Sequence, residues 1–166
     1  MTSEKKCLFC KIIHAKIAAA KIWEDSDNIA ILDPNPTIHG QTIVMSKSHI
    51  DSDVFNEDDK EYEYFMTSVK HVAELLQEKL EVKRVAMVAD GMNIDHLYIT
   101  LYPLHGLGKK FKTITPPNHV FFEKYEGYIT TQPGPQIPMD DLQKLAKTLQ
   151  NPCYWSDSED DEEEYA

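Results

Sequence analysis

The stretch Asp95-His96-Leu97-Tyr98-Ile99-Thr100-Leu101-Tyr102-Pro103 decides how this sequence folds. Its odd-numbered positions from 97 to 101 are apolar, whereas positions 96, 98, 100 and 102 are polar or amphipathic. Because successive side chains of a strand point to opposite faces, this alternation predicts a strand with one packed face. The other face presents a row of functional groups, unless the segment is an ordinary half-exposed strand.

Further strands and one long helix are predicted around this segment. Extended structure is expected at residues 21–25, 28–32, 41–45, 85–89 and 97–102, where β-favouring residues are bounded by turn residues. Apolar residues recur three and four positions apart from Asp58 to Leu80, which predicts a long amphipathic helix. A short C-terminal helix is expected from Met139 to Leu149. This order does not alternate strand with helix, so it indicates an α+β fold with a five-stranded antiparallel sheet.

The composition is typical of a folded domain in a reducing compartment. A chain of 166 residues is one domain of ordinary size, and its net charge of −11 disfavours a generic binder of nucleic acids or membrane surfaces. No apolar run approaches the ~20 residues of a membrane-spanning helix, and no signal-peptide pattern follows Met1, so no membrane association is expected. Cys7, Cys10 and Cys153 are too few for a disulfide framework, which favours the cytoplasm or the nucleus.

The negative charge is concentrated at the end of the chain. Seven of the eleven residues from Ser156 to Ala166 are acidic, and a disordered acidic tail is therefore expected at residues 151–166. Residues 1–150 are expected to form the domain, with a loop segment rich in proline and aromatic residues at 104–138. The tail is either a solubilising appendage or, like the aromatic loop, a surface for a protein partner.

Four residues from three separate segments have the chemistry of a metal site. Cys7 and Cys10 form a CxxC motif, His49 follows the third predicted strand, and His96 begins the fifth. Two thiolates and two imidazoles suit tetrahedral zinc. The alternative interpretation is two buried cysteines and two surface histidines with no metal.

Five blocks of the sequence resemble the histidine triad (HIT) superfamily of nucleotide-binding proteins, hydrolases and transferases. In chain order they are Cys7-Leu8-Phe9-Cys10-Lys11-Ile12-Ile13, Ala20-Lys21-Ile22-Trp23-Glu24-Asp25, Ile31-Leu32-Asp33-Pro34-Asn35-Pro36, Gly40-Gln41-Thr42-Ile43-Val44-Met45-Ser46-Lys47-Ser48-His49-Ile50, and residues 91–103. The resemblance implies a HIT-like fold from about Cys7 to Pro103. It also implies a homodimer in which two sheets join into one continuous sheet.

The catalytic positions depart from the family's pattern. Its three alternating histidines correspond here to His96, Tyr98 and Thr100, and its fourth histidine corresponds to Gln41. The family's middle histidine attacks the α-phosphate of a nucleotide, so the resemblance implies that Tyr98 stands where the nucleophile belongs. A phenol has a pKa near 10 and needs a neighbouring base before it can attack phosphorus.

The ligand-binding positions are better preserved than the catalytic ones. The resemblance implies that the zinc ligands are Cys7, Cys10, His49 and His96. It implies a ribose contact at Asp33 and a purine-base pocket near Phe9, Ile12 and Ile31. Each of these last four residues also has an ordinary interpretation as a core or turn residue.

These observations favour a degenerate HIT protein over a working enzyme. The first hypothesis is a zinc-containing pseudoenzyme that acts by binding a purine nucleotide or a protein partner. The second is an active nucleotide phosphoramidase or hydrolase that uses Tyr98, or a metal-free His96, in a substituted site. The third is a metal-regulated adaptor that binds no nucleotide.

Overall fold

The computed structural model describes residues 6–116, 118–130 and 136–141 of the chain. The chain divides into two compact units, Met1–Thr113 and Ile114–Ala166, and each is considered by itself. The predicted strands and the long helix all lie in the first unit. The predicted domain boundary at residue 150 stays a prediction.

The first unit is built on the predicted antiparallel sheet, which is confirmed. The five strands are β1 (Lys21–Glu24), β2 (Asn28–Leu32), β3 (Thr42–Ser46), β4 (Val85–Val88) and β5 (Tyr98–Pro103). Their order across the sheet is β1-β2-β3-β5-β4, and every neighbouring pair is antiparallel. The strand that decides the fold therefore lies next to the central strand β3, while β1 and β4 form the two edges.

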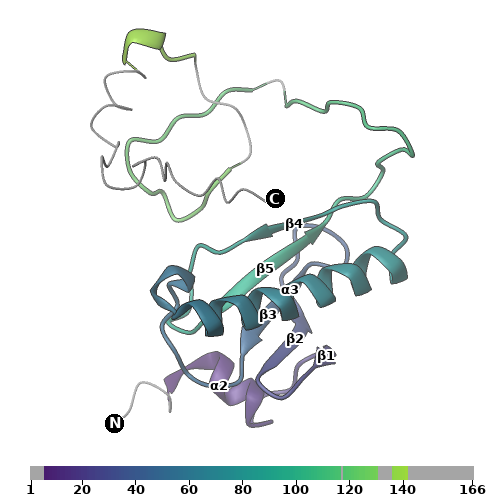
Figure 1. Cartoon of the computed structure of the whole chain (residues 1–166), viewed down its shortest axis with the longest axis vertical. Coiled ribbons are helices and arrows are strands. Elements are labelled where there is room, and N and C mark those ends of the chain that lie inside the picture. Colours follow the sequence, from purple (N-terminus) through teal and green to yellow (C-terminus); the bar gives the residue numbers. More distant parts are fainter. Residues whose placement is uncertain (1–5, 117, 131–135, 142–166) are drawn as a thin grey trace, which may run out of the picture. The chain divides into compact units, whose positions relative to one another are not determined.

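The long helix α3 (Asp59–Lys79) covers one face of this sheet, as Figure 1 shows. It begins where predicted, because the Asp58 carboxylate accepts hydrogen bonds from the backbone amides of Lys60 and Glu61. The apolar stripe of α3 packs on Ile99 and Leu101 of β5 and on Leu97, which immediately precedes this strand. The buried members of this core are Ala30, Val44, Val54, Phe65, Val69, Val72, Leu76, Leu97, Ile99 and Leu101.

The opposite face of the sheet is buried as well. A short helix, α2 (Leu8–Ile13), packs there, and the second core consists of Phe9, Ile29, Ile31, Ile43, Met45 and Tyr98. His96 is fully buried, Tyr98 is 3% exposed and Thr100 is 9% exposed. The half-exposed alternative for this strand is therefore wrong, because both faces of β5 are covered.

The remaining expectations concern the chain after β5. Residues 139–141 are helical, and the rest of the predicted helix to Leu149 lies outside the described residues, as do Cys153 and the acidic tail at 151–166. The described parts of the loop segment 104–138 contain neither helix nor strand. A single 3₁₀ turn, Val54–Asn56, precedes α3. Among the described helices, none combines the length and apolarity needed to cross a membrane.

Candidate functional site

Four side chains converge at one end of the face that α2 covers. Cys7 immediately precedes α2, Cys10 lies within it, His49 follows β3, and His96 lies two residues before β5 begins. One ligand atom from each residue lies within 4.8 Å of the others. The alternative of surface histidines does not describe His96, which has no exposed area.

The distances within the cluster suit a four-coordinate ion. The Nδ1 atom of His96 lies 3.5 Å from Cys7 Sγ, 3.6 Å from Cys10 Sγ and 3.3 Å from His49 Nδ1, and Cys10 Sγ lies 3.5 Å from His49 Nδ1. An ion bound at about 2.0–2.1 Å by nitrogen and about 2.3 Å by sulfur has tetrahedral edges of about 3.3 Å between nitrogens and about 3.6 Å between nitrogen and sulfur. The donor set therefore fits a metal ion at its centre.

The backbone of β3 fixes the orientation of His96. The His96 Nε2 atom lies 2.7 Å from the carbonyl oxygen of Ser46, to which only a protonated nitrogen can donate. The lone pair is then on Nδ1, the atom that faces the other three donors. Burial, with a smaller contribution from His49, lowers the pKa of His96 and so favours the neutral imidazole that a metal requires.

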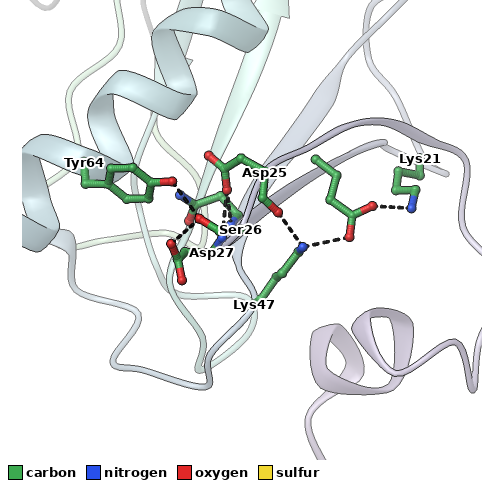
Figure 2. A network of polar contacts seen from close by, with 8 residues as sticks. Lys21, Asp25, Ser26, Asp27, Lys47 and Tyr64 are labelled. Carbon is green, nitrogen blue, oxygen red and sulfur yellow. Dashed lines mark hydrogen bonds and ion pairs between the residues drawn. The ribbon is translucent and has the colours of Figure 1, made fainter.

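A network of polar contacts links Lys47, which follows β3 and precedes His49, to the end of β1 (Figure 2). The Lys47 ammonium lies 2.7 Å from the Glu24 carboxylate and donates to the carbonyl oxygen of Asp25 at 2.5 Å. Lys21 also pairs with Glu24, and hydrogen bonds from Lys21 and then from Lys47 lower the pKa of that carboxyl to about 2. The ammonium group of Lys47 is therefore held at the turn between β1 and β2.

The side chain of Tyr98 is a hydrogen-bonded phenol. Tyr98 Oη donates to Asp90 Oδ1 at 3.1 Å and accepts from the backbone amide of Asn93 at 3.4 Å. The ring of Phe9 packs edge-on against the Tyr98 ring, with centroids 5.3 Å apart. Burial raises the pKa of Tyr98, and the charge of Asp90 adds to that effect. The phenol is therefore protonated at neutral pH and is a poor nucleophile.

Thr100 and Gln41 are the other two residues predicted to stand at histidine positions of the family. Thr100 is almost completely buried in β5, and Gln41 precedes β3. The Gln41 amide nitrogen donates to Asp33 Oδ2 at 2.6 Å, and its oxygen accepts from the Thr37 amide at 2.8 Å. Gln41 thus joins the two ends of the loop between β2 and β3 and orients the carboxylate of Asp33.

The predicted nucleotide-binding residues separate into two groups. Phe9 and Ile31 are members of the buried core under α2, and Ile12 packs against that core. Asp33 is not a member of this core and lies just after β2, where its carboxylate also accepts from the Asn35 amide at 2.8 Å. The structure therefore gives Phe9 and Ile31 a packing role whether or not they also contact a ligand.

A cavity of about 530 Å³ lies beside Asp33, in the size range of small-molecule sites. It is lined by Ile22, Leu32, Asp33, Pro36, His39, Gly40, Gln41, Leu75, Leu76, Lys79 and Leu80. Most of these side chains are apolar, and one wall is the end of α3, which supplies Leu75, Leu76 and Lys79. The polar lining residues are Asp33, His39, Gln41 and Lys79. The sequence did not predict this cavity, because the loop between β2 and β3 that forms one wall has no periodic pattern of apolar residues.

Comparison with known proteins identifies the family. A profile of the HIT domain matches residues 14–105. A HIT-like protein of Methanocaldococcus jannaschii is 34% identical over 103 residues, which cover 58% of this chain and 78% of that protein. An adenosine 5′-monophosphoramidase of Saccharomyces cerevisiae is 24% identical over 148 residues, which cover 89% and 83% of the two chains.

A solved structure agrees with the fold. A zinc-bound histidine triad family protein from Mycobacterium smegmatis superposes with a TM-score of 0.55 at 24% identity, covering 69% of this chain and 86% of that chain. At this identity the likeness concerns the fold. With the profile match over more than half of the sequence, it leads to one conclusion: the chain belongs to the HIT domain family.

Proposed function

We propose that this protein is a zinc-containing HIT pseudoenzyme that acts by binding a purine nucleotide or a protein partner. One observation carries the proposal: the four metal donors are assembled, while the phenol at the nucleophile position is hydrogen-bonded to a carboxylate. The scaffold is thus equipped to hold a metal, but Tyr98, Thr100 and Gln41 supply no imidazole at the positions that correspond to the family's other histidines.

Zinc is the metal that the donor set favours. Two thiolates and two imidazoles at tetrahedral spacing suit zinc better than they suit the oxygen-seeking ions magnesium and calcium. Four protein ligands leave no open position, which is typical of a structural site. The zinc would therefore tie α2 to the ends of β3 and β5 and add to folding stability.

The loss of catalysis follows from the acid–base chemistry around Tyr98. Carboxylates are ordinarily protonated near pH 4 and phenols lose their proton near pH 10, so a carboxylate partner is too weak a base to activate a phenol. The pKa of Tyr98 is raised further by burial. His96 cannot act as a base while its Nδ1 lone pair binds metal.

Two observations support a ligand-binding and partner-binding role. The cavity beside Asp33 has mostly apolar walls and a few polar lining groups, the usual form of a small-molecule site. In the second unit, Phe121, Tyr128 and Ile129 are each more than half exposed, which is a surface on which a protein partner could pack.

A homodimer is proposed through the edge strand β4. This strand pairs only with β5, and Met87 on it is 57% exposed. Pairing of two β4 edges would join the sheets of two chains into one. Light scattering on the purified protein tests this: a mass near twice 19.1 kDa is expected, and a mass of one chain would contradict it.

The alternative is a working phosphoramidase, as in the yeast relative. It would use the Tyr98 hydroxyl, which occupies the nucleophile position. Substitution of Tyr98→Phe decides between the two. Turnover that disappears in this variant supports the alternative, whereas unchanged turnover excludes Tyr98 as the nucleophile and leaves a contaminant or a metal-free His96 as its source.

The experiment that tests the proposed function combines metal analysis with calorimetric titration. One zinc per chain and saturable binding of a purine compound are expected for the purified protein. A preparation that retains no zinc contradicts the metal assignment, and the absence of any nucleotide or nucleoside binding redirects the search to protein partners.

A further inference from the structure

We propose that an exposed cluster of cations beside Phe111 binds single-stranded nucleic acid. The cluster lies in the first unit, on the segments just before β4 and after β5. It belongs neither to the four metal donors nor to the lining of the cavity beside Asp33. The members of this cation cluster are Lys83, Arg84, Lys109, Lys110 and Lys112.

Two contacts with Arg84 bring the members of the cluster together. The amide of Leu104, just after β5, donates to the carbonyl oxygen of Arg84 at 2.9 Å. The guanidinium group of Arg84 also lies over the Phe111 ring, 5.6 Å from its centroid. Both ends of the segment 104–111 are therefore held at Arg84. This arrangement places the lysines around Phe111 beside Lys83 and Arg84, although the two segments lie far apart in the sequence.

Within the described residues, no carboxylate forms an ion pair with the cation cluster. Glu81 lies two residues before Lys83 and is not paired with it, and the sequence has no Asp or Glu from residue 96 to residue 122. The cations of the described ion pairs are Lys21, Lys47, Lys70 and Lys79. All five members of the cluster are exposed. The net charge of −11 therefore disfavours binding through the whole surface, but this positive patch is open to an anionic partner.

The exposed ring of Phe111 indicates which anionic partner fits. Phe111 is 81% exposed, and Lys110 and Lys112 flank it in the sequence. Proteins that hold single strands combine aromatic rings, on which bases stack, with cations that neutralise phosphates. An acidic peptide would satisfy the cations but has no base to stack on the ring. A double helix keeps its bases stacked inside, so a single strand matches this surface best.

An anionic membrane fits the same surface less well. A membrane is an extended surface, so the many acidic groups elsewhere on this chain would also face it and be repelled. A short strand contacts only the cation cluster. Charges farther from the strand than the Debye length of about 8–10 Å are largely screened at moderate salt. The local positive charge therefore attracts a strand even though the whole chain is acidic.

The test is the fluorescence anisotropy of a labelled oligo(dT) strand of about twelve nucleotides, titrated with the zinc-loaded full-length protein at several salt concentrations. Thymine is a pyrimidine, so this probe does not depend on the proposed purine binding. Vesicles that contain phosphatidylserine and a peptide of residues 156–166 are titrated in parallel.

Three variants locate the binding surface. Lys109→Gln/Lys110→Gln/Lys112→Gln removes three charges of the cluster, and Phe111→Leu removes the aromatic ring but keeps an apolar side chain. The matched control, Lys16→Gln/Lys60→Gln/Lys70→Gln, removes three charges from other exposed positions of the first unit. Circular dichroism and zinc content confirm that each variant is folded and loaded.

The wild-type protein is expected to bind the strand saturably at about 50 mM salt and more weakly as salt is added. The triple variant at positions 109, 110 and 112 should weaken binding at least about tenfold and reduce the slope of log affinity against log salt by about 2. Phe111→Leu should weaken binding about fivefold or more without changing this slope, because stacking involves no counterion. The control variant should bind almost as the wild type does.

Four results would overturn the inference. They are no binding of the strand by the wild type, equal losses in the two triple variants, no effect of Phe111→Leu, and tighter binding of the vesicles or the acidic peptide than of the strand. None of these results bears on the metal site or on the proposed purine binding, which calorimetry tests separately.

Discussion

The two ends of the face under α2 have become chemically different. At one end, Cys7, Cys10, His49 and His96 form a compact set of metal donors. At the other end lie Tyr98, Thr100 and Gln41, of which Tyr98 donates to the carboxylate of Asp90 and Gln41 donates to that of Asp33. The two regions share one strand, since His96 and Tyr98 are only two residues apart. The comparison teaches that two side chains close together in one chain segment can belong to clusters of different chemistry, with sulfur and nitrogen donors at one end and carboxylate oxygens at the other.

The end that holds the four metal donors should contribute most to stability, so Cys10→Ser should lower the free energy of unfolding more than the other substitutions below. Cys10 is buried and contacts both His49 and His96, so its loss removes a ligand and leaves the other donors without their ion. We expect the free energy of unfolding to fall by at least about 3 kcal/mol, and the melting temperature by roughly 6–12 °C.

Differential scanning calorimetry with zinc analysis measures this effect. The matched control is Cys153→Ser, which removes a thiol that belongs to no predicted or described site. If Cys10→Ser and Cys153→Ser melt at the same temperature with the same zinc content, the cluster does not hold a structural metal.

The loop that positions Asp90 is the next most sensitive element. Gly91 has a φ of +62°, and a Cβ added to it would lie 2.6 Å from the carbonyl oxygen of Ser52. Gly91→Ala therefore combines left-handed backbone strain with a backbone collision, and should cost about 2–3 kcal/mol. Gly108→Ala, where an added Cβ meets no atom within 4 Å, is the control in a urea titration. Equal midpoints for the two variants would show that the loop adjusts freely.

The hydrogen bonds of Ser68, which link α3 to Asp25 and to Asn28 of β2, should contribute less to stability, and their contribution should depend on pH. Ser68 donates to Asp25 Oδ2 at 2.7 Å and accepts from the Asn28 side chain at 3.0 Å. Burial alone raises the pKa of Asp25, but hydrogen bonds from Ser68 and from the amides of Asn28 and Asp27 outweigh it, and the net shift is downward. Ser68→Ala should cost about 1–2 kcal/mol at pH 6.

The sign of the pH dependence follows from the lowered pKa of Asp25. The stabilisation is complete above the unfolded-state pKa of about 3.9 and is lost as the pH falls through the lower folded-state value. The difference in the free energy of unfolding between the wild type and Ser68→Ala should therefore decrease as the pH falls from 6 towards 2.5. Acid also protonates the metal ligands in both proteins, so only the difference between them is informative. A difference in the free energy of unfolding that stays constant over this pH range would contradict the assigned role of Asp25.

Tyr98→Phe should have the smallest effect on stability. The substitution removes the hydrogen bond to Asp90 but keeps the ring that packs against Phe9. We expect the free energy of unfolding to change by no more than about 1 kcal/mol. Thermal unfolding of the zinc-loaded variant measures this change. A loss comparable to that of Cys10→Ser would mean that the two ends of the face are energetically coupled.

The sequence predicted the elements in which apolar residues recur with a regular period. The spacing of apolar residues from Asp58 to Leu80 anticipated α3, and the alternation along residues 97–102 anticipated the two faces of β5. Periodicity has this power because it records which side of an element is buried. The convergence of Cys7, Cys10, His49 and His96 was anticipated because metal ligands combine rare residue types with a limited set of spacings.

Loop and backbone groups account for what the sequence could not predict. The carbonyl of Ser46 orients His96, yet a backbone carbonyl has no signature in the residue type. The contact between Asp90 and Tyr98 depends on the path of the loop from β4 to β5, which includes the left-handed Gly91. The burial of both faces of β5 depends on where α2 packs, and a helix of six residues gives only a weak pattern.

Turnover of an adenosine 5′-phosphoramidate by the zinc-loaded protein tests the central claim most directly. The account predicts that AMP is released no faster by the wild type than by Tyr98→Phe, while the protein retains one zinc per chain. Release of AMP by the wild type that Tyr98→Phe abolishes would contradict it. That result would show that the phenol beside Asp90 is a working nucleophile.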